Sequence, residues 1–234
     1  MLPAFYQNCF QNILTPTQYK MLQVLVMLLQ FHKTVTIEKL ATLFPQPIRF
    51  ESRRRSIQRF LSFPQLSIKL LWFPVLKQWV KISKFKKGKR LTVAIDRTQW
   101  RDQNLFVISL IEDRRAIPIY WLSLPKRGCS NLREQKELIR PVMRLFKGYR
   151  ILVLGDREFH SVKLANWLDS KGVDFVLRQK QGTYIQRENS PYQRLLAFRT
   201  KTRDILLYSG YSSHKTKRFW QVQFSWVLPT KISG

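Results

Sequence analysis

Two aspartates, Asp96 and Asp156, each directly follow a short apolar run. The runs 91–95 and 151–155 have the composition of buried β-strands. Ligands bind beyond the carboxyl ends of strands in open α/β sheets, so neighbouring strands would bring both carboxylates into one crevice. Two such charges about 5 Å apart repel by roughly 3 kcal/mol at an effective dielectric constant of about 20. A shared proton, an arginine or a divalent cation would have to offset this repulsion.

Carboxylate oxygens are ligands that suit Mg²⁺ or Mn²⁺. A pair of these ions can activate a water and stabilise the leaving oxygen of a phosphodiester. The sequence therefore predicts Asp96 and Asp156 as catalytic, metal-binding residues, with Mg²⁺ or Mn²⁺ as the cofactor. A structural role stays open, because aspartate is common in turns and at helix caps. Arg97 and Arg157 directly follow the two aspartates, so simple ion pairs are a further interpretation.

The charge balance points to a polyanionic partner. The 234 residues include 42 Lys and Arg against 14 Asp and Glu, a formal charge of +28. A field of this size attracts nucleic acid, and less specifically a membrane surface or an acidic protein. A generic basic protein, or a bias in base composition, is the alternative. Ten of the fourteen acids fall in residues 91–180, so we expect acid chemistry in that segment and binding surface on either side of it.

Cysteine content and hydropathy indicate the compartment. The two cysteines, Cys9 and Cys129, lie far apart with no metal-like spacing, which fits a reducing environment. The apolar run 21–31 is too short to span a bilayer and starts too late for a signal peptide. We therefore expect a cytoplasmic protein with no membrane partner.

The first 88 residues have helical periodicity. Helices are predicted at 16–32 with a cap at Thr15, at 37–44 with a cap at Thr36, at 51–63, and at 66–82 with an interruption. Ile57, Phe60 and Leu61 are expected on one face of the third helix. Two short helices with an arginine run fit either a helix-turn-helix or a small bundle with a solvated basic face. The predicted DNA-binding residues of this region are Arg53, Arg54, Arg55 and Arg59.

A basic turn at 84–90 is the candidate domain boundary. Strands then follow at 91–95, 104–113 and 116–125, a helix at 131–146, a strand at 150–156, a helix at 161–172 and a strand at 173–180. This order predicts an α/β domain with a mixed sheet, antiparallel first and parallel later, covered by helices. The other candidate DNA-binding residues are Lys86, Lys87, Lys89, Arg90, Arg157, Arg178 and Lys180.

The segments TVAIDRTQW and LVLGDREFHS, with the helix and VDFVLRQK after them, resemble DDE transposases of insertion sequences, particularly the insertion-sequence-four (IS-4) family. The resemblance covers about residues 90–180. It implies an RNase H-like domain at 89–234, with Asp96 and Asp156 as the first two metal-binding acids, behind a helical DNA-binding region at 1–88. It also implies metal-dependent cleavage and strand transfer of double-stranded DNA at terminal inverted repeats and target sites, in a prokaryotic nucleoid, and is compatible with a homodimer.

The third acid of that family does not match. Tyr184 and Arg187 have the expected spacing, but Pro191 stands where the glutamate should be. The expectation is therefore a C-terminally truncated copy whose incomplete metal site does not support cleavage. A stand-alone metal-dependent nuclease, or a non-catalytic DNA-binding protein that inhibits full-length transposase, is the alternative.

Overall fold

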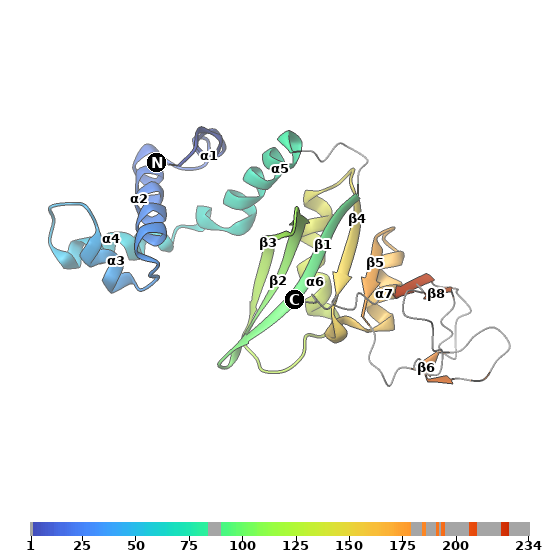
Figure 1. Cartoon of the computed structure of the whole chain (residues 1–234). Coiled ribbons are helices and arrows are strands. Elements are labelled where there is room, and N and C mark those ends of the chain that lie inside the picture. Colours follow the sequence, from blue (N-terminus) through green and yellow to red (C-terminus); the bar gives the residue numbers. More distant parts are fainter. Residues whose placement is uncertain are drawn as a thin grey trace, which may run out of the picture. The chain divides into compact units, whose positions relative to one another are not determined.

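The computed structural model describes residues 2–83 and 90–178, and beyond these only 184–185, 191, 193–194, 206–209 and 221–224. The chain divides into two compact units, residues 1–86 and 87–234 (Figure 1). The predicted boundary is the basic turn 84–90, of which only Arg90 is among the described residues. Lys86, Lys87 and Lys89 of this turn therefore lie outside the described residues. None of the described helices has the length and apolar character needed to cross a membrane.

Unit 1 is helical in its described part, as predicted. Thr15 caps α2 in a capping box, in which its hydroxyl accepts a hydrogen bond from the Gln18 backbone N–H and the Gln18 side chain accepts one from the Thr15 N–H. Thr36 also precedes a helix, but its side chain makes no capping bond. The helices are α1 (Ala4–Phe10), α2 (Pro16–His32), α3 (Ile37–Leu43), α4 (Phe50–Leu61), η1 (Pro64–Leu66), η2 (Ile68–Trp72) and α5 (Phe73–Ile82).

A small apolar core joins α2, α3 and α4. The side chains of Ile57 and Phe60 point inward from α4 and are at most 4% exposed. Leu61, which shares this side of the helix, is 52% exposed and lies outside the core. The remaining buried members of this core are Leu25, Leu28, Leu40, Ala41 and Phe44.

Unit 2 contains a five-stranded mixed sheet in the order β3-β2-β1-β4-β5. The first three strands are antiparallel to one another, whereas β4 runs parallel to both β1 and β5. This arrangement confirms the predicted α/β class, with a mixed sheet that is antiparallel first and parallel later and a helical region before it. The elements are β1 (Arg90–Trp100), β2 (Gln103–Glu112), β3 (Arg115–Leu124), α6 (Leu132–Leu145), β4 (Arg150–Gly155), η3 (Arg157–Phe159), α7 (Val162–Asp169) and β5 (Asp174–Leu177). Two further short pairs are β6 (Tyr184–Ile185) with β7 (Gln193–Arg194), and β8 (Leu206–Ser209) with β9 (Gln221–Phe224).

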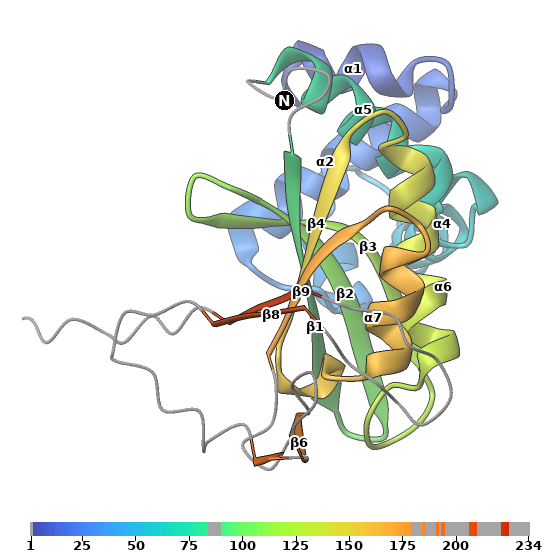
Figure 2. The ribbon, with the colours of Figure 1, turned by 90° about the vertical axis from the view of Figure 1, so that its right-hand side faces the viewer.

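Both described helices of unit 2, α6 and α7, lie on the same face of this sheet (Figure 2). The strands alternate accordingly, with Leu91, Val93 and Ile95 of β1 buried toward the helices. Asn131 starts α6 with a capping box to Glu134. The helix-covered face therefore fixes which β1 side chains point inward and which point to the other face.

At one edge of the sheet, β3 carries an irregularity. Its register to β2 shifts between the pairs Ile108↔Tyr120 and Ser109↔Pro118, so Ile119 is an extra residue. Such a bulge bends the strand locally, and proline lacks the N–H that a strand ladder needs.

Strand β1 is longer than predicted, because it does not end at Asp96. Its parallel pairing with β4 stops at Ile95↔Gly155, but its antiparallel pairing with β2 continues to Trp100↔Gln103. Asp96 is thus the first β1 residue beyond the end of the β4 ladder.

Candidate functional site

The two predicted acids follow a matched pair of residues on adjacent strands. Ile95 pairs with Gly155 in the parallel ladder, so Asp96 and Asp156 come next on strands whose backbones lie about 4.8 Å apart. The backbone at Asp156 is extended, and side chains alternate between faces along extended chain. Each aspartate is therefore directed to the face opposite α6 and α7, and both are exposed.

Neither aspartate is neutralised by an arginine within the described residues. The Asp156 carboxylate accepts a hydrogen bond from the Glu158 backbone N–H at 3.0 Å, and this bond uses only one of its two oxygens. Arg97 lies at an inward position of β1 and binds Glu158 instead of Asp96. The ion-pair interpretation therefore does not hold for Arg97.

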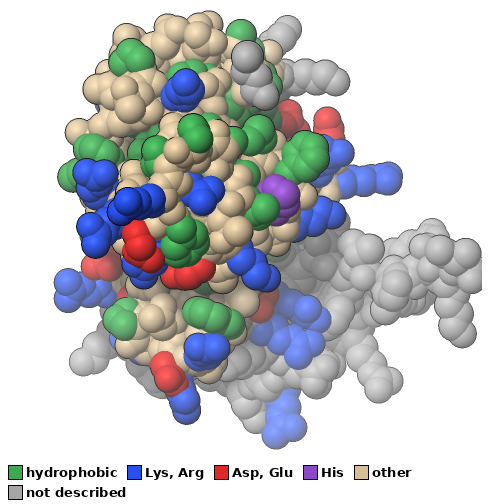
Figure 3. All heavy atoms as spheres, turned by 90° about the vertical axis from the view of Figure 1, so that its left-hand side faces the viewer, with side chains coloured by type: hydrophobic (Ala, Val, Ile, Leu, Met, Phe, Trp, Pro, Cys, Tyr) green, Lys and Arg blue, Asp and Glu red, His purple; other side chains and the backbone are tan. Residues whose placement is uncertain are grey.

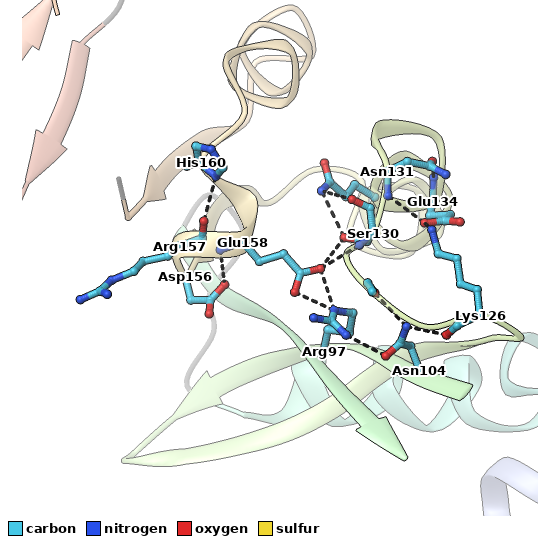
Figure 4. A network of polar contacts seen from close by, with 12 residues as sticks. Arg97, Asn104, Lys126, Ser130, Asn131, Glu134, Asp156, Arg157, Glu158 and His160 are labelled. Carbon is cyan, nitrogen blue, oxygen red and sulfur yellow. Dashed lines mark hydrogen bonds and ion pairs between the residues drawn. The ribbon is translucent and has the colours of Figure 1, made fainter. Parts of the chain in front are cut away.

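Arg97 is the centre of a polar network that includes Glu158, two residues after Asp156 (Figure 4). Its Nε donates to both Glu158 carboxylate oxygens, at 2.8 and 2.6 Å, and its Nη1 donates to Asn104 Oδ1 at 2.7 Å. The Asn104 amide in turn donates to the carbonyl oxygens of Lys126 and Gly128, at 2.8 and 3.0 Å. Through these contacts, β1, β2, η3 and the loop after β3 are held together.

Glu158 is the acceptor that satisfies this network. The Ser130 backbone N–H and hydroxyl both donate to Glu158 Oε1 at 2.9 Å, just before α6 begins. Burial by itself would raise the pKa of Glu158, but the hydrogen bonds from Ser130 and Arg97, with the Arg97 charge, lower it below its usual value. Glu158 is therefore an ionised structural partner, and its side chain points toward Arg97 and Ser130 (Figure 4).

The neighbouring residues of the GDREF segment pack the turn. A Cβ on Gly155 would lie 2.8 Å from Leu177 Cδ2 and 2.9 Å from Phe159 Cβ, so glycine is needed for this close approach. Phe159 is fully buried and stacks on Phe106, with ring centroids 5.6 Å apart. Arg157 is exposed and extends away from Glu158 (Figure 4). The segment thus anchors the loop that carries Asp156.

The candidate phosphate ligands of unit 2 fall at two different places. Arg178 directly follows Leu177, the β5 partner of Gly155, and its backbone N–H donates to the Gly155 carbonyl at 2.9 Å. Arg178 therefore lies at the carboxyl ends of the parallel strands, where Asp96 and Asp156 also lie. Arg90 pairs with Arg150 at the opposite end of the sheet, and Lys180 lies outside the described residues.

The described residues fit the first two ligands of a divalent-cation site. Two exposed carboxylates without arginine partners, on adjacent strands, are the hard oxygen donors that Mg²⁺ or Mn²⁺ prefers. Over the described part of the chain, no group of three or more His, Cys, Asp or Glu side chains converges on one point. Glu158 is not a third ligand, because Arg97 and Ser130 occupy its carboxylate.

Sequence reasoning missed the Arg97–Glu158 network, although a signal was present. The alternation 91, 93, 95 continues to 97, which places a guanidinium on the helix-covered face. A charged group at such a position requires a buried partner. The sequence does not indicate which of the nearby acids fills that role.

Residues 129–225 match the family model of the transposase DDE domain. The match includes Asp156 and Glu158 and begins after Asp96. A crystal structure of the Mos1 strand transfer complex is similar to 69% of this chain at 11% identity, with a TM-score of 0.27, too low to establish a shared fold. The chain spans 59% of the Mos1 chain. Among curated proteins, none matches this sequence.

Proposed function

We propose that this protein belongs to an insertion sequence and acts on DNA as a DDE transposase of the IS-4 type. The single observation that carries the proposal is the register Ile95↔Gly155, because it makes Asp96 and Asp156 neighbours at one sheet edge. The match to the transposase DDE domain supports the same reaction class. Double-stranded DNA is the substrate, as terminal inverted repeats and as target, and the charge of +28 favours it.

Asp96 and Asp156 would hold Mg²⁺ or Mn²⁺, which supplies activation of a water or hydroxyl for attack on a phosphodiester and stabilises the leaving oxygen. Arg178 shares their edge, and Arg157 lies exposed beside Asp156. We assign to both arginines the binding of phosphate oxygens near the reacting bond. Arg97 and Glu158 are positioning residues, since they act on the site only through the loops that they hold.

Within the described part of the chain, Asp96 and Asp156 are joined by no third His, Cys, Asp or Glu side chain. In-line displacement in the DDE pattern depends on the geometry of three acidic ligands. We therefore predict that the 234-residue chain binds DNA but does not cleave it at a useful rate.

Metal binding provides the first test, and it does not depend on activity. Mn²⁺ binding is measured by water proton relaxation with the full chain. We expect D96N and D156N each to weaken Mn²⁺ binding by at least about tenfold, because loss of even an outer-shell partner of a metal ligand has an effect of that size. D174N is the matched control, because Asp174 pairs with Leu152 near the other end of β4. Equal Mn²⁺ binding by wild type, D96N and D156N would refute the proposed site.

Nicking of supercoiled plasmid provides the second test. The wild-type chain with Mg²⁺ is expected to leave the plasmid intact. Mg²⁺-dependent nicking that disappears in D156A would show that two carboxylates suffice, and would overturn the prediction of inactivity while supporting the assigned site.

A further inference from the structure

The four arginines of α4 point in three different directions. An α-helix turns by about 100° per residue, so residues three, four and seven apart share a face. Arg53 shares the inward face with Ile57 and Phe60, which are buried. Arg54 lies about 100° further round the helix. Arg55 and Arg59 lie together on a third face.

Arg53 and Arg54 already have partners within unit 1. Arg53 Nη1 donates to the carbonyl oxygens of Thr42 and Phe44, at 3.3 and 3.1 Å, and so satisfies the end of α3. Arg54 forms ion pairs with Glu38 and Glu51, at 3.5 and 3.9 Å. These two guanidinium groups therefore hold α4 against α3 and are balanced by acids or carbonyl groups.

Arg55 and Arg59 are exposed and form no ion pair or hydrogen bond within the described residues. Ser52 and Ser56 share their face of the helix, at spacings of three and four residues. A surface hollow is formed there by Ser52, Arg55, Ser56, Gln58 and Arg59. None of these five lining residues is acidic, so two positive charges stand beside hydroxyl and amide donors.

We propose that this hollow binds phosphate oxygens of the DNA backbone through Arg55 and Arg59, with Ser52 and Ser56 as supporting donors. The two guanidinium groups stand one helical turn apart, about 6 Å along the axis, so that each can reach its own phosphate. Each of the five lining residues has a polar or charged side chain, whereas a membrane-binding helix needs large apolar side chains there. Lys and Arg side chains are spread over the face that Figure 3 presents. The inference rests on the proposed function only for the choice of DNA as the phosphate source.

The test is binding of the full chain to a random-sequence duplex, measured by fluorescence anisotropy at several salt concentrations without divalent metal. Each phosphate contact contributes about 0.9 to the slope of log affinity against log salt. R55Q/R59Q should therefore reduce the slope by about 1.8 and weaken binding to every sequence alike. S52A/S56A keeps the charge, and should lower affinity with no change in slope.

R114Q/R115Q is the matched control, since it removes the same charge at the exposed β2–β3 turn, remote from the Asp96 edge. We expect the control slope to equal that of wild type. The proposal is overturned if R55Q/R59Q changes the slope no more than this control does. It is also overturned if R55Q/R59Q loses binding to anionic phosphatidylserine vesicles but not to the duplex. Mn²⁺ binding at Asp96 and Asp156 is measured separately, so failure of one proposal is distinguishable from failure of the other.

Discussion

Replacing Glu158 by glutamine isolates its ion pair with Arg97. The carboxylate accepts hydrogen bonds from Arg97 Nε and from the Ser130 N–H and hydroxyl. In glutamine an NH₂ group replaces one carboxylate oxygen, so an N–H would face Arg97 or Ser130, which are themselves donors. The substitution would also leave Arg97 without its counter-charge. Removing one partner of a buried pair costs about 3–5 kcal/mol. The Arg97 and Glu158 side chains keep 15% and 12% exposure, so we expect the lower end, about 3 kcal/mol.

Urea denaturation, combined with hydrogen exchange of the β4 amides, measures the stability of unit 2 separately from that of unit 1. A double-mutant cycle with R97Q then gives the coupling energy of the pair. We expect a favourable coupling of about 1–3 kcal/mol. In E158Q the Arg97 guanidinium has already lost its counter-charge, so the further replacement R97Q should cost less than it does in wild type. A coupling near zero would show that the two side chains stabilise the fold independently, and would refute the network as a unit.

The stability difference between wild type and E158Q should also depend on pH. The folded-state pKa of Glu158 is lowered from its ordinary value of 4.5. A carboxyl of this kind stabilises the fold above its unfolded pKa, and the stabilisation is lost as pH falls through the folded value. The difference should therefore be constant above about pH 5 and shrink at lower pH. A difference that stays the same down to the acid transition would contradict this assignment.

E137Q is the matched control for E158Q. Glu137 pairs with Arg133 on the surface of α6, with side-chain exposures of 47% and 88%. Exposed pairs of this spacing contribute about 0.5 kcal/mol or less. Equal effects of E137Q and E158Q would mean that burial of the Arg97–Glu158 pair has no energetic consequence.

Three further substitutions test the packing around the site and the start of α2. Gly155→Ala should destabilise unit 2 by about 1–3 kcal/mol through overpacking against Leu177 and Phe159, measured by urea denaturation. Phe159→Ala removes a fully buried ring and should cost about 3–5 kcal/mol; a cost below about 1 kcal/mol, as for an exposed residue, would contradict the described stacking. Thr15→Ala should cost about 1 kcal/mol by helix-resolved hydrogen exchange, and more than Thr36→Ala, whose hydroxyl makes no capping bond.

Hydrophobic periodicity was sufficient to predict the order of the main helices and strands from α2 to β5, but it did not indicate α1. The helix at α2 follows from Thr15, Pro16 and the apolar repeat after them, and the structure has all three in place. The strand β1 was predicted too short, because the apolar run stops at Ile95 and residues 96–99 are polar. They remain extended by pairing with β2 alone. Such one-sided pairing depends on the partner strand and is not visible in the local sequence.

The sequence could predict that the two candidate acids lie close together, but not which residues support them. Asp96 and Asp156 stand out as acids after apolar runs, and the sheet makes their strands adjacent. The run Arg53–Arg55 reads in sequence as one basic patch. Helical rotation separates these side chains, and only the surroundings of each one determine whether it is paired within the fold. Sequence spacing therefore identifies charge, whereas the packed structure decides which charges are available to a ligand.

The bulge and proline of β3 restrict how copies of this protein can associate. A regular edge strand offers a row of unpaired amide and carbonyl groups onto which a second chain can add. At β3 the extra residue Ile119 and the missing N–H of Pro118 interrupt that row. A second molecule therefore cannot add to β3 as one continuous ladder past this point. Pairing through this edge strand would be confined to the residues on one side of the bulge.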